Sequence, residues 1–249
     1  MLARHIKNAI NRGLGHFGYR AVRADNMPLG SLTAFCRGIA ARGFTPRTVL
    51  DVGANRGDWS REVRAVFPQA KFILIEPQAE LGPALDAFCA SAPGSRWIAA
   101  GAGAQPGELK FTVCPDTVSS SFAIPAEQAA REGLRQRSVP VVTLDDVCRE
   151  AGVVPEMVKL DVEGFEAEVL KGAGTLIGRT ELFLVEATFG NPRPGAPNFL
   201  EIVSLMARYG YQAYDFTNFQ HRPHDGALGL CEMAFALEQG QLRRDLRWR

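Results

Sequence analysis

Two apolar segments in the second half of the chain carry ionisable side chains. The four residues are Lys159, Asp161, Glu163 and Glu186. We expect segments 158–162 and 181–187 to be strands of a parallel sheet, where charges are costly unless they are paired or used. The three carboxylates stand at or just beyond the carboxyl ends of these strands, where open α/β sheets bind ligands. They are therefore the candidate catalytic groups, because a carboxylate held there can act as a general base.

The spacing of these residues leaves a second interpretation open. Lys159, Asp161 and Glu163 alternate along the chain, so a strand through them would place all three on one side. A lysine on that side can form a structural ion pair with a neighbouring carboxylate. Lys159 and Asp161 are thus candidates either for chemistry or for a buried salt bridge.

A glycine-containing loop in the first half of the chain is the second informative stretch. A buried strand is expected at 48–52, Gly53 and Gly57 bracket a tight loop, and a helical pattern follows. This order of strand, glycine loop and helix brings backbone N–H groups against a nucleotide-like ligand. A second apolar strand, 72–75, leads into Glu76, whose carboxylate can accept hydrogen bonds from both hydroxyls of a ribose.

The loop differs from the dinucleotide fingerprint G-x-G-x-x-G, because Asn55 stands where the second glycine belongs and Asp51 precedes the loop. An acid at the end of the first strand, followed by Gly-x-x-x-Gly, is similar to motif I of class I methyltransferases, which bind S-adenosylmethionine (SAM). We therefore expect SAM as the cofactor rather than NAD. A plain βαβ turn with a structural glycine is the remaining alternative.

The rest of the pattern predicts an α/β fold, a mostly parallel sheet with a closing antiparallel strand pair at 211–216 and 231–237. The third strand, near 96–98, runs into a loop in which every residue from 99 to 104 is Ala or Gly. Such a loop lets a flat ring lie close to the backbone, which makes Gly101 and Ala102 candidate cofactor contacts. Trp59 fits the helical spacing of a core residue better than a ligand-stacking role.

Residues 108–140 interrupt the alternation of strands and helices. Strand-like stretches at 109–114 and 139–144 flank Ser119-Ser-Ser-Phe122, and we expect an inserted hairpin, called the flap below. Its serines could hydrogen-bond a ligand or simply form turns. The Pro- and Gly-rich segment 191–197 is a candidate lid over the acceptor.

Length and composition favour one main domain. The chain has 249 residues, a net charge of +1 and 46% hydrophobic residues, which gives no general reason to expect a nucleic-acid partner. Five scattered cysteines without a C-x-x-C motif favour reduced thiols and a cytoplasmic protein. No apolar run is long enough for a transmembrane helix. The basic segment 1–28 is expected to be an extension that lies over the domain at 29–249, with weak peripheral membrane contact as the alternative.

Taken together, the motifs resemble the FkbM family of SAM-dependent methyltransferases. The resemblance covers roughly residues 29–237, in the order and spacing of that family. The matching stretches are Val49-Leu-Asp-Val-Gly-Ala-Asn-Arg-Gly57, Glu76-Pro77, Thr143-Leu-Asp-Asp146, Val158-Lys-Leu-Asp-Val-Glu-Gly164, Glu168-Val-Leu-Lys-Gly-Ala173 and Val185-Glu186. The resemblance implies a Rossmann-like fold and O-methylation of a hydroxyl on a sugar, glycan or other natural product.

Strand-end positions and the resemblance together assign roles to residues. Asp51 is expected to receive the amino group of SAM directly or through water, and Glu76 to bind its ribose. Asp161 or Glu163 is the expected base, with Glu186 orienting the acceptor or sharing a divalent cation, an idea that rests on carboxylate clustering alone. The expected cofactor-binding set is Asp51, Gly53, Ala54, Asn55, Gly57, Glu76, Pro77, Gly101 and Ala102. A SAM-fold binding or scaffold protein without turnover, or a nicotinamide-dependent oxidoreductase, are the alternatives.

Overall fold

A computed structural model of the chain describes residues 13–14, 29–190, 193 and 195–247. Its centre is a seven-stranded sheet with the order β3-β2-β1-β7-β8-β10-β9. Every pairing is parallel except those of β10, which runs antiparallel to both of its neighbours. This confirms the predicted Rossmann-like arrangement. The strands are β1 (Thr48–Val52), β2 (Lys71–Ile75), β3 (Arg96–Ile98), β7 (Met157–Leu160), β8 (Leu182–Thr188), β9 (Tyr211–His221) and β10 (Leu228–Leu237).

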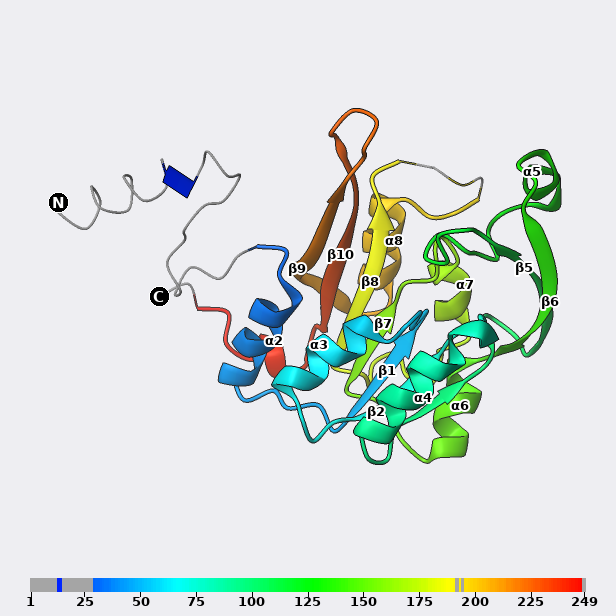
Figure 1. The fold of residues 1–249 in the computed structure, drawn as a ribbon. Helices are drawn as coiled ribbons and strands as arrows, with labels where there is room; N and C mark the ends of the chain where they lie inside the picture. Colours follow the sequence, from blue (N-terminus) through cyan, green and yellow to red (C-terminus); the bar gives the residue numbers. More distant parts are fainter. Residues whose placement is uncertain (1–12, 15–28, 191–192, 194, 248–249) are drawn as a thin grey trace.

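Helices cover both faces of this sheet (Figure 1). Neighbouring residues of a strand point to opposite faces, so Val49 joins one apolar cluster and Leu50 the other. The first cluster packs under α2 (Leu32–Ala41), α3 (Asp58–Val66) and α4 (Gly82–Ser91), which follows η1 (Ala79–Leu81). The second packs under α6 (Leu144–Ala151), α7 (Glu166–Lys171) and α8 (Phe199–Arg208). A short η2 (Gln241–Arg243) follows the last strand.

Polar side chains begin several of these helices. Ser31 and Thr143 are the N-caps of α2 and α6, where they accept hydrogen bonds from the backbone N–H groups of Ala34 and Asp146. Asn198 and Glu201 form a reciprocal capping box at the start of α8. These caps fix where the three helices begin.

A second, three-stranded sheet lies in the region of the expected flap, and the name flap is kept for it. It consists of β4 (Gly101–Ala102), β6 (Arg135–Val142) and β5 (Gly107–Val113) in that order, with α5 (Ala126–Arg131) between β5 and β6. In Figure 1 this sheet stands apart from the main one, on the side opposite to the β9–β10 hairpin. The space over the carboxyl ends of the parallel strands therefore has a wall on each side.

Two strand boundaries differ from the sequence prediction. Strand β7 ends at Leu160, so Asp161 and Glu163 belong to the following loop and do not share a strand face with Lys159. The reason is a sharp turn in which Glu163 and Gly164 both have positive φ, of 57° and 96°. The hairpin is longer than expected, because backbone pairing continues beyond Phe216 through polar residues whose pattern does not indicate a strand.

The N-terminal segment, membrane-spanning helices and the cysteines were also subjects of sequence predictions. The basic segment 1–28, expected to be an extension over the domain, lies outside the described residues apart from 13 and 14. Among the helices that the structure describes, none has both the length and the apolar character required to cross a bilayer. All five cysteines carry free thiols.

Candidate active site

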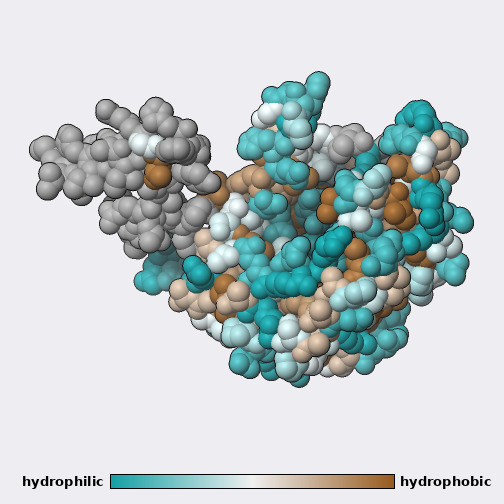
Figure 2. All heavy atoms as spheres, viewed as in Figure 1, coloured by the Kyte–Doolittle hydropathy of each residue, from teal (hydrophilic) through white to brown (hydrophobic). Residues whose placement is uncertain are grey.

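A cavity of about 560 Å³ lies at the carboxyl ends of the parallel strands. It is bounded by the loops after β1, β2 and β7, by the flap, and by the β9–β10 hairpin. Figure 2 shows the hairpin and the flap as two projections with a recess between them. Six residues of the expected cofactor set line it: Gly53, Asn55, Glu76, Pro77, Gly101 and Ala102. The three candidate catalytic residues also line it: Asp161, Glu163 and Glu186.

The glycine loop is fixed by close backbone contacts. The N–H groups of Gly53 and Ala54 donate to the carbonyl of Ile75, at 2.9 and 3.2 Å. Gly53 has a φ of +77°, and a Cβ there would lie 1.8 Å from the carbonyl oxygen of Asp161. Only glycine fits this position, because both the backbone conformation and the space exclude a side chain. Ala54 and Gly57 do not line the cavity, and they shape the loop from behind.

Glu76 is buried at the end of β2 and already holds the glycine loop. Its Oε2 accepts the N–H of Asn55 at 2.7 Å, and its Oε1 accepts the N–H of Gln78 at 2.9 Å and its side-chain Nε2 at 3.2 Å. Burial raises the pKa of Glu76, although these hydrogen bonds and the charge of Lys159 oppose the change. Oε2 receives only one bond and keeps acceptor capacity for a ligand hydroxyl. Sequence reasoning missed Gln78, which carries no motif signal.

Asp51 lies behind the glycine loop instead of on the cavity wall. Its carboxylate is fully buried, and Oδ2 accepts a 2.6 Å hydrogen bond from the hydroxyl of Ser60. Oδ1 lies 3.3 Å from Nζ of Lys159. The two groups form an ion pair but not a hydrogen bond. In this arrangement Asp51 has no direct route to a ligand in the cavity, and its contacts are with the protein.

Lys159 connects the loop to the acidic cluster. Its Nζ donates to the carbonyl of Gly53 at 2.9 Å and lies 3.2 Å from Oδ2 of Asp161. Burial by itself lowers the pKa of Lys159, but the charges of Asp161, Asp51 and Glu232 outweigh it and raise the pKa. The geometry is that of a structural ion pair, the second of the two interpretations that the sequence left open.

The three candidate catalytic carboxylates converge. One oxygen from each of Asp161, Glu163 and Glu186 lies within 4.8 Å of the other two. Glu163 is paired with Arg193, whose guanidinium reaches its carboxylate at 2.5 Å and its carbonyl oxygen at 2.7 Å. Arg193 also donates to the carbonyl of Ser119 in the flap at 3.1 Å. Sequence reasoning missed Arg193, although it is the one charged residue between 189 and 197.

Glu186 differs from the other two carboxylates. Within the part of the chain that the structure describes, its carboxylate has no hydrogen bond and no ion pair. Burial raises its pKa well above the usual value, and the charges of Asp161, Glu163 and Glu166 act in the same direction. The pKa of Glu163 is also raised, first by burial and then by its acidic neighbours, against the charge of Arg193. The cluster therefore favours a bound proton or a bound positive charge.

The small-residue loop accommodates a ring that belongs to the protein. A Cβ on Gly101 would lie 2.3 Å from the ring of Phe122 in the flap. Phe122 also packs against Phe111 and Phe165, with ring centroids 4.9 and 5.5 Å away. Phe165 does not line the cavity. The glycine at 101 is thus required by flap packing, while the backbone of this loop still faces the cavity.

The flap serines are used within the protein. Ser120 Oγ accepts the N–H of Cys114 at 2.9 Å, and the Ser119 hydroxyl donates to the Asp116 carboxylate at 2.7 Å. The hydroxyl of Ser121 donates to the carbonyl of Glu163 at 2.7 Å. The contact of Ser121 holds the flap against the acidic loop, and Ser119 and Ser120 also line the cavity.

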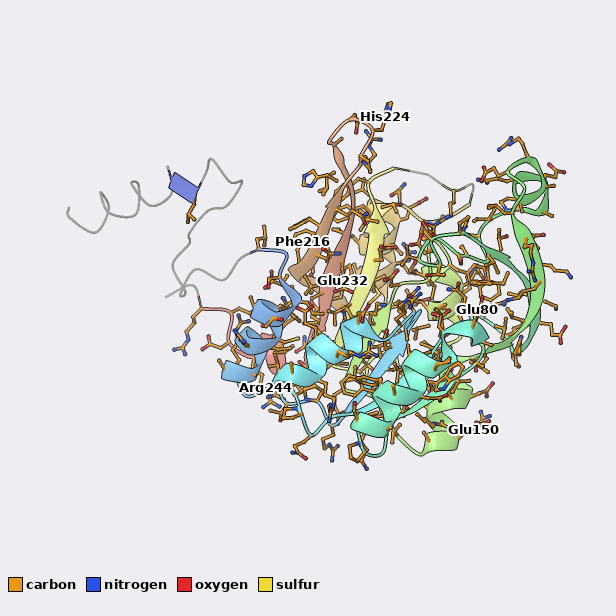
Figure 3. All side chains as sticks on the ribbon, in the orientation of Figure 1. Glu80, Glu150, Phe216, His224, Glu232 and Arg244 are labelled. Carbon is orange, nitrogen blue, oxygen red and sulfur yellow. The ribbon has the colours of Figure 1, made fainter. Side chains whose placement is uncertain are left out.

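The hairpin supplies cavity residues that the sequence did not reveal. Asn218, Gln220 and Leu230 line the cavity opposite the flap. Deeper in the same hairpin, Glu232 accepts hydrogen bonds from the hydroxyl of Thr217 at 2.5 Å and from Nε1 of Trp59 at 3.3 Å. Figure 3 shows Glu232 within the body of the molecule and His224 at the outer tip of the hairpin. Trp59 packs against the core and does not line the cavity, as its spacing predicts.

Comparisons with known proteins identify the family of the chain. The family model described as "Methyltransferase FkbM domain" matches residues 51–213. The methyltransferase sdnD of Sordaria araneosa is 27% identical over 188 residues, which cover 64% of this chain and 72% of that protein.

Solved methyltransferase structures are more distantly similar. The N-methyltransferase NodS of Bradyrhizobium japonicum is 7% identical with a TM-score of 0.47, covering 82% of this chain and 93% of that one. The magnesium protoporphyrin IX methyltransferase of Synechocystis, with bound SAM, is 10% identical with a TM-score of 0.47, covering 82% and 76%. Since the family model spans well over half of the chain and includes both the glycine loop and the acidic loop after β7, the chain belongs to the FkbM family of SAM-dependent methyltransferases.

Proposed function

We propose that this enzyme transfers the methyl group of SAM to a hydroxyl oxygen of a sugar, glycan or other natural product. The observation that carries the proposal is the convergence of Asp161, Glu163 and Glu186 on the cavity that the glycine loop borders. A hydroxyl becomes a good nucleophile only when its proton is removed, and carboxylates can take that proton. The assignments of individual residues below belong to the same proposal.

The lining of the cavity fits SAM. Glu76 would accept the ribose hydroxyls, and the loop from Gly53 to Asn55 would face the methionine end. The backbone of Gly101 and Ala102, with Pro77, would border the adenine. Asp51 would act by positioning, because it holds Lys159, which in turn fixes the carbonyl of Gly53 and the carboxylate of Asp161.

The charge of the cavity supports a cationic ligand. Five acidic residues line it, Glu76, Asp116, Asp161, Glu163 and Glu186. The cations nearest to the cluster of the last three are Lys159 and Arg193. SAM brings a sulfonium, so its reactive end carries the charge that this cluster lacks. A nicotinamide dinucleotide would bring an anionic pyrophosphate, which like charges would repel. This argues against the oxidoreductase alternative.

SAM supplies a methyl group already activated on a positively charged sulfur. The protein has to hold the acceptor oxygen in line with the methyl carbon, remove its proton and exclude bulk water. The acceptor would lie between the flap and the amides of Asn218 and Gln220, which can hydrogen-bond further hydroxyls. Residues 191, 192 and 194 of the candidate lid lie outside the described residues. Arg193 would border the acceptor, because it connects the acidic loop with the flap.

The test is transfer of labelled methyl from SAM to a panel of hydroxyl compounds, such as methyl glycosides and macrolide alcohols. The product is then located by NMR. An O-methyl product supports the proposal, and methyl transfer only to nitrogen or carbon would refute it. Tight SAM binding with no transfer to any extract or panel compound would favour the scaffold alternative. A thermal-shift comparison of SAM with NAD tests the oxidoreductase alternative. Stabilisation by NAD and not by SAM would favour it.

A shared divalent cation remains an alternative role for the three carboxylates. Lys159 and Arg193 already neutralise two of them, so the cluster does not require a metal. We expect turnover to be unchanged after dialysis against EDTA. Loss of turnover that Mg²⁺ or Mn²⁺ restores would overturn this expectation. A cytoplasmic location is also part of the proposal, and it rests on the scattered cysteines.

A further inference from the structure

We propose that Glu186 is the general base, and that it holds a proton until the positively charged cofactor enters the cavity. This proposal rests on the proposed function and deepens it. The sequence favoured Asp161 or Glu163 as the base, and the structure points to their neighbour. Cations are distributed unequally among the three carboxylates.

Two of the three carboxylates already have a cationic partner. Asp161 lies 3.2 Å from Nζ of Lys159, and Glu163 lies 2.5 Å from the guanidinium of Arg193. A carboxylate held by a cation is a weak proton acceptor, because protonation would break the pair. Glu186 makes no such contact with any described residue, yet it lines the same cavity. It is therefore the carboxylate best able to accept a proton from the substrate.

The groups around Glu186 are mostly acidic. Asp161 and Glu163 face it from the loop after β7, and Glu166 lies beyond them at the start of α7. Glu232 is directly opposite it in the register of β8 and β10. Lys159 is the cation that acts on it. Burial and like charges therefore favour the neutral form of Glu186 in the ligand-free protein, which agrees with its raised pKa.

Cofactor binding changes this balance. The sulfonium of SAM adds a positive charge to the cavity, and an added positive charge favours the carboxylate form of Glu186. The proton that Glu186 gives up appears in solution. S-adenosylhomocysteine (SAH) has an uncharged sulfur, so it should leave the proton in place. The two ligands share the same amino and carboxyl groups, so a difference between them isolates the sulfonium.

The transfer step then balances. The acceptor oxygen forms a bond to the methyl carbon while the C–S bond breaks, and the bonding electron pair passes to sulfur. The hydroxyl proton passes to a carboxylate oxygen of Glu186. The site ends with a methyl ether, neutral SAH and a protonated Glu186, which is the protonation state of the ligand-free enzyme. No further acid or base is needed to complete the cycle.

The test is calorimetric titration of SAM and of SAH at pH 7, in buffers with different enthalpies of ionisation. The dependence of the heat on the buffer gives the number of protons released. We expect the wild-type protein to release more protons with SAM than with SAH, up to the one proton that a single group can give. Glu186→Gln should lose this difference. Glu186→Asp should keep it, and Glu150→Gln, an exposed change on α6, should match the wild type.

A neighbouring variant sharpens the test. Asp161→Asn removes one negative charge from beside Glu186, so the proton release should persist but move to lower pH. Binding of SAH by each variant shows that the cavity is intact. An equal release for SAM and SAH in the wild type would overturn the proposal, as would a difference that survives in Glu186→Gln. Failure of SAM to bind would instead overturn the proposed function itself.

Discussion

At the scale of single residues, Glu76 is the residue whose proposed contact with the cofactor can be tested most directly. Glu76→Ala removes the acceptor expected to hold the ribose, and it also frees the N–H of Asn55 in the glycine loop. We expect SAM binding to weaken by about 1–3 kcal/mol, the range for a lost charge-assisted hydrogen bond. Calorimetric titration with SAM measures the change.

A matched control is available for this substitution. Glu150 is an exposed glutamate on α6, far from the cavity (Figure 3), and Glu150→Ala should bind SAM like the wild type. Glu76→Gln keeps one acceptor oxygen and should give an intermediate loss. Unchanged affinity in Glu76→Ala would remove the ribose role from this residue.

Lys159 provides a second prediction at this scale. Lys159→Met leaves Asp51 and Asp161 without their cation, and Asp51 is fully buried. We expect a loss of about 3–5 kcal/mol in the free energy of unfolding, as for a broken buried ion pair. Urea denaturation measures this loss.

A double variant tests the cause. In Asp51→Asn/Lys159→Met the unpaired charge at position 51 is gone as well. The double variant should therefore lose less stability than the sum of the two single changes. Simple additivity would show that the two side chains do not depend on each other.

At this scale, the sequence predicts which residues are candidates for chemistry, but not which side chains pair with each other. Asp161, Glu163 and Glu186 were identified because charges in apolar strands require a reason. Asp51 was expected to receive the amino group of SAM directly or through water, and no pattern in the sequence indicated its contacts with Ser60 and Lys159. The ion pair between Arg193 and Glu163 could not be predicted for a related reason. The two residues are thirty positions apart in the sequence, so their contact leaves no local pattern.

At the scale of elements, the flap and the small-residue loop form one packed unit. Gly101→Ala would place a methyl group 2.3 Å from the ring of Phe122, so the flap has to move. We expect this variant to lose about 1–3 kcal/mol of stability through overpacking, together with affinity for SAM. Thermal unfolding and SAM titration measure the two effects.

The cause can again be isolated with a second change. Phe122→Ala also costs stability, because the ring packs against Phe111 and Phe165. In Gly101→Ala/Phe122→Ala the clash is absent, so the double variant should be more stable than the sum of the single effects implies. A double variant as unstable as that sum would mean that the new methyl group meets some other obstacle.

Element boundaries show where sequence reasoning stops. The strands β1, β2 and β8 were predicted closely, because short apolar runs between turn signals indicate buried strands. The end of β7 and the length of β9 were not. Backbone conformation ended the first, at Leu160, and backbone pairing extended the second, to His221. Neither depends on side-chain hydrophobicity, so hydrophobic patterns do not report them.

At the scale of the whole molecule, the fold concentrates acidic groups at one edge of the sheet. The overall charge of +1 gives no sign of this, because composition averages over the surface. The ends of β7 and β8 and the start of β10 meet there, and they bring Asp161, Glu186 and Glu232 together. The enzyme thus holds a local surplus of acidic groups, whose charged forms a cationic ligand stabilises.

This surplus has a consequence for the stability of the ligand-free protein. Burial raises the pKa of Glu232 to about 7, although the hydroxyl of Thr217 and the charge of Lys159 oppose it. Burial likewise raises the pKa of Glu166 to about 7. Between the unfolded pKa near 4.5 and the folded value, the folded state binds more protons than the unfolded state. The free energy of unfolding must therefore fall as pH rises through this window.

Glu232→Gln tests this argument, because the amide keeps an acceptor for Thr217 and Trp59 but cannot ionise. A shift from 4.5 to about 7 corresponds to about 3 kcal/mol for one group. We expect the wild type to be more stable at pH 5 than at pH 8, and the drop between them to be smaller by about 3 kcal/mol in Glu232→Gln. Comparing drops cancels any constant cost of the substitution, and Glu150→Gln should leave the drop unchanged. If urea denaturation gave the same drop in both proteins, Glu232 would have to be charged at both pH values, and the buried edge of the sheet would be better compensated than the contacts of Lys159 indicate.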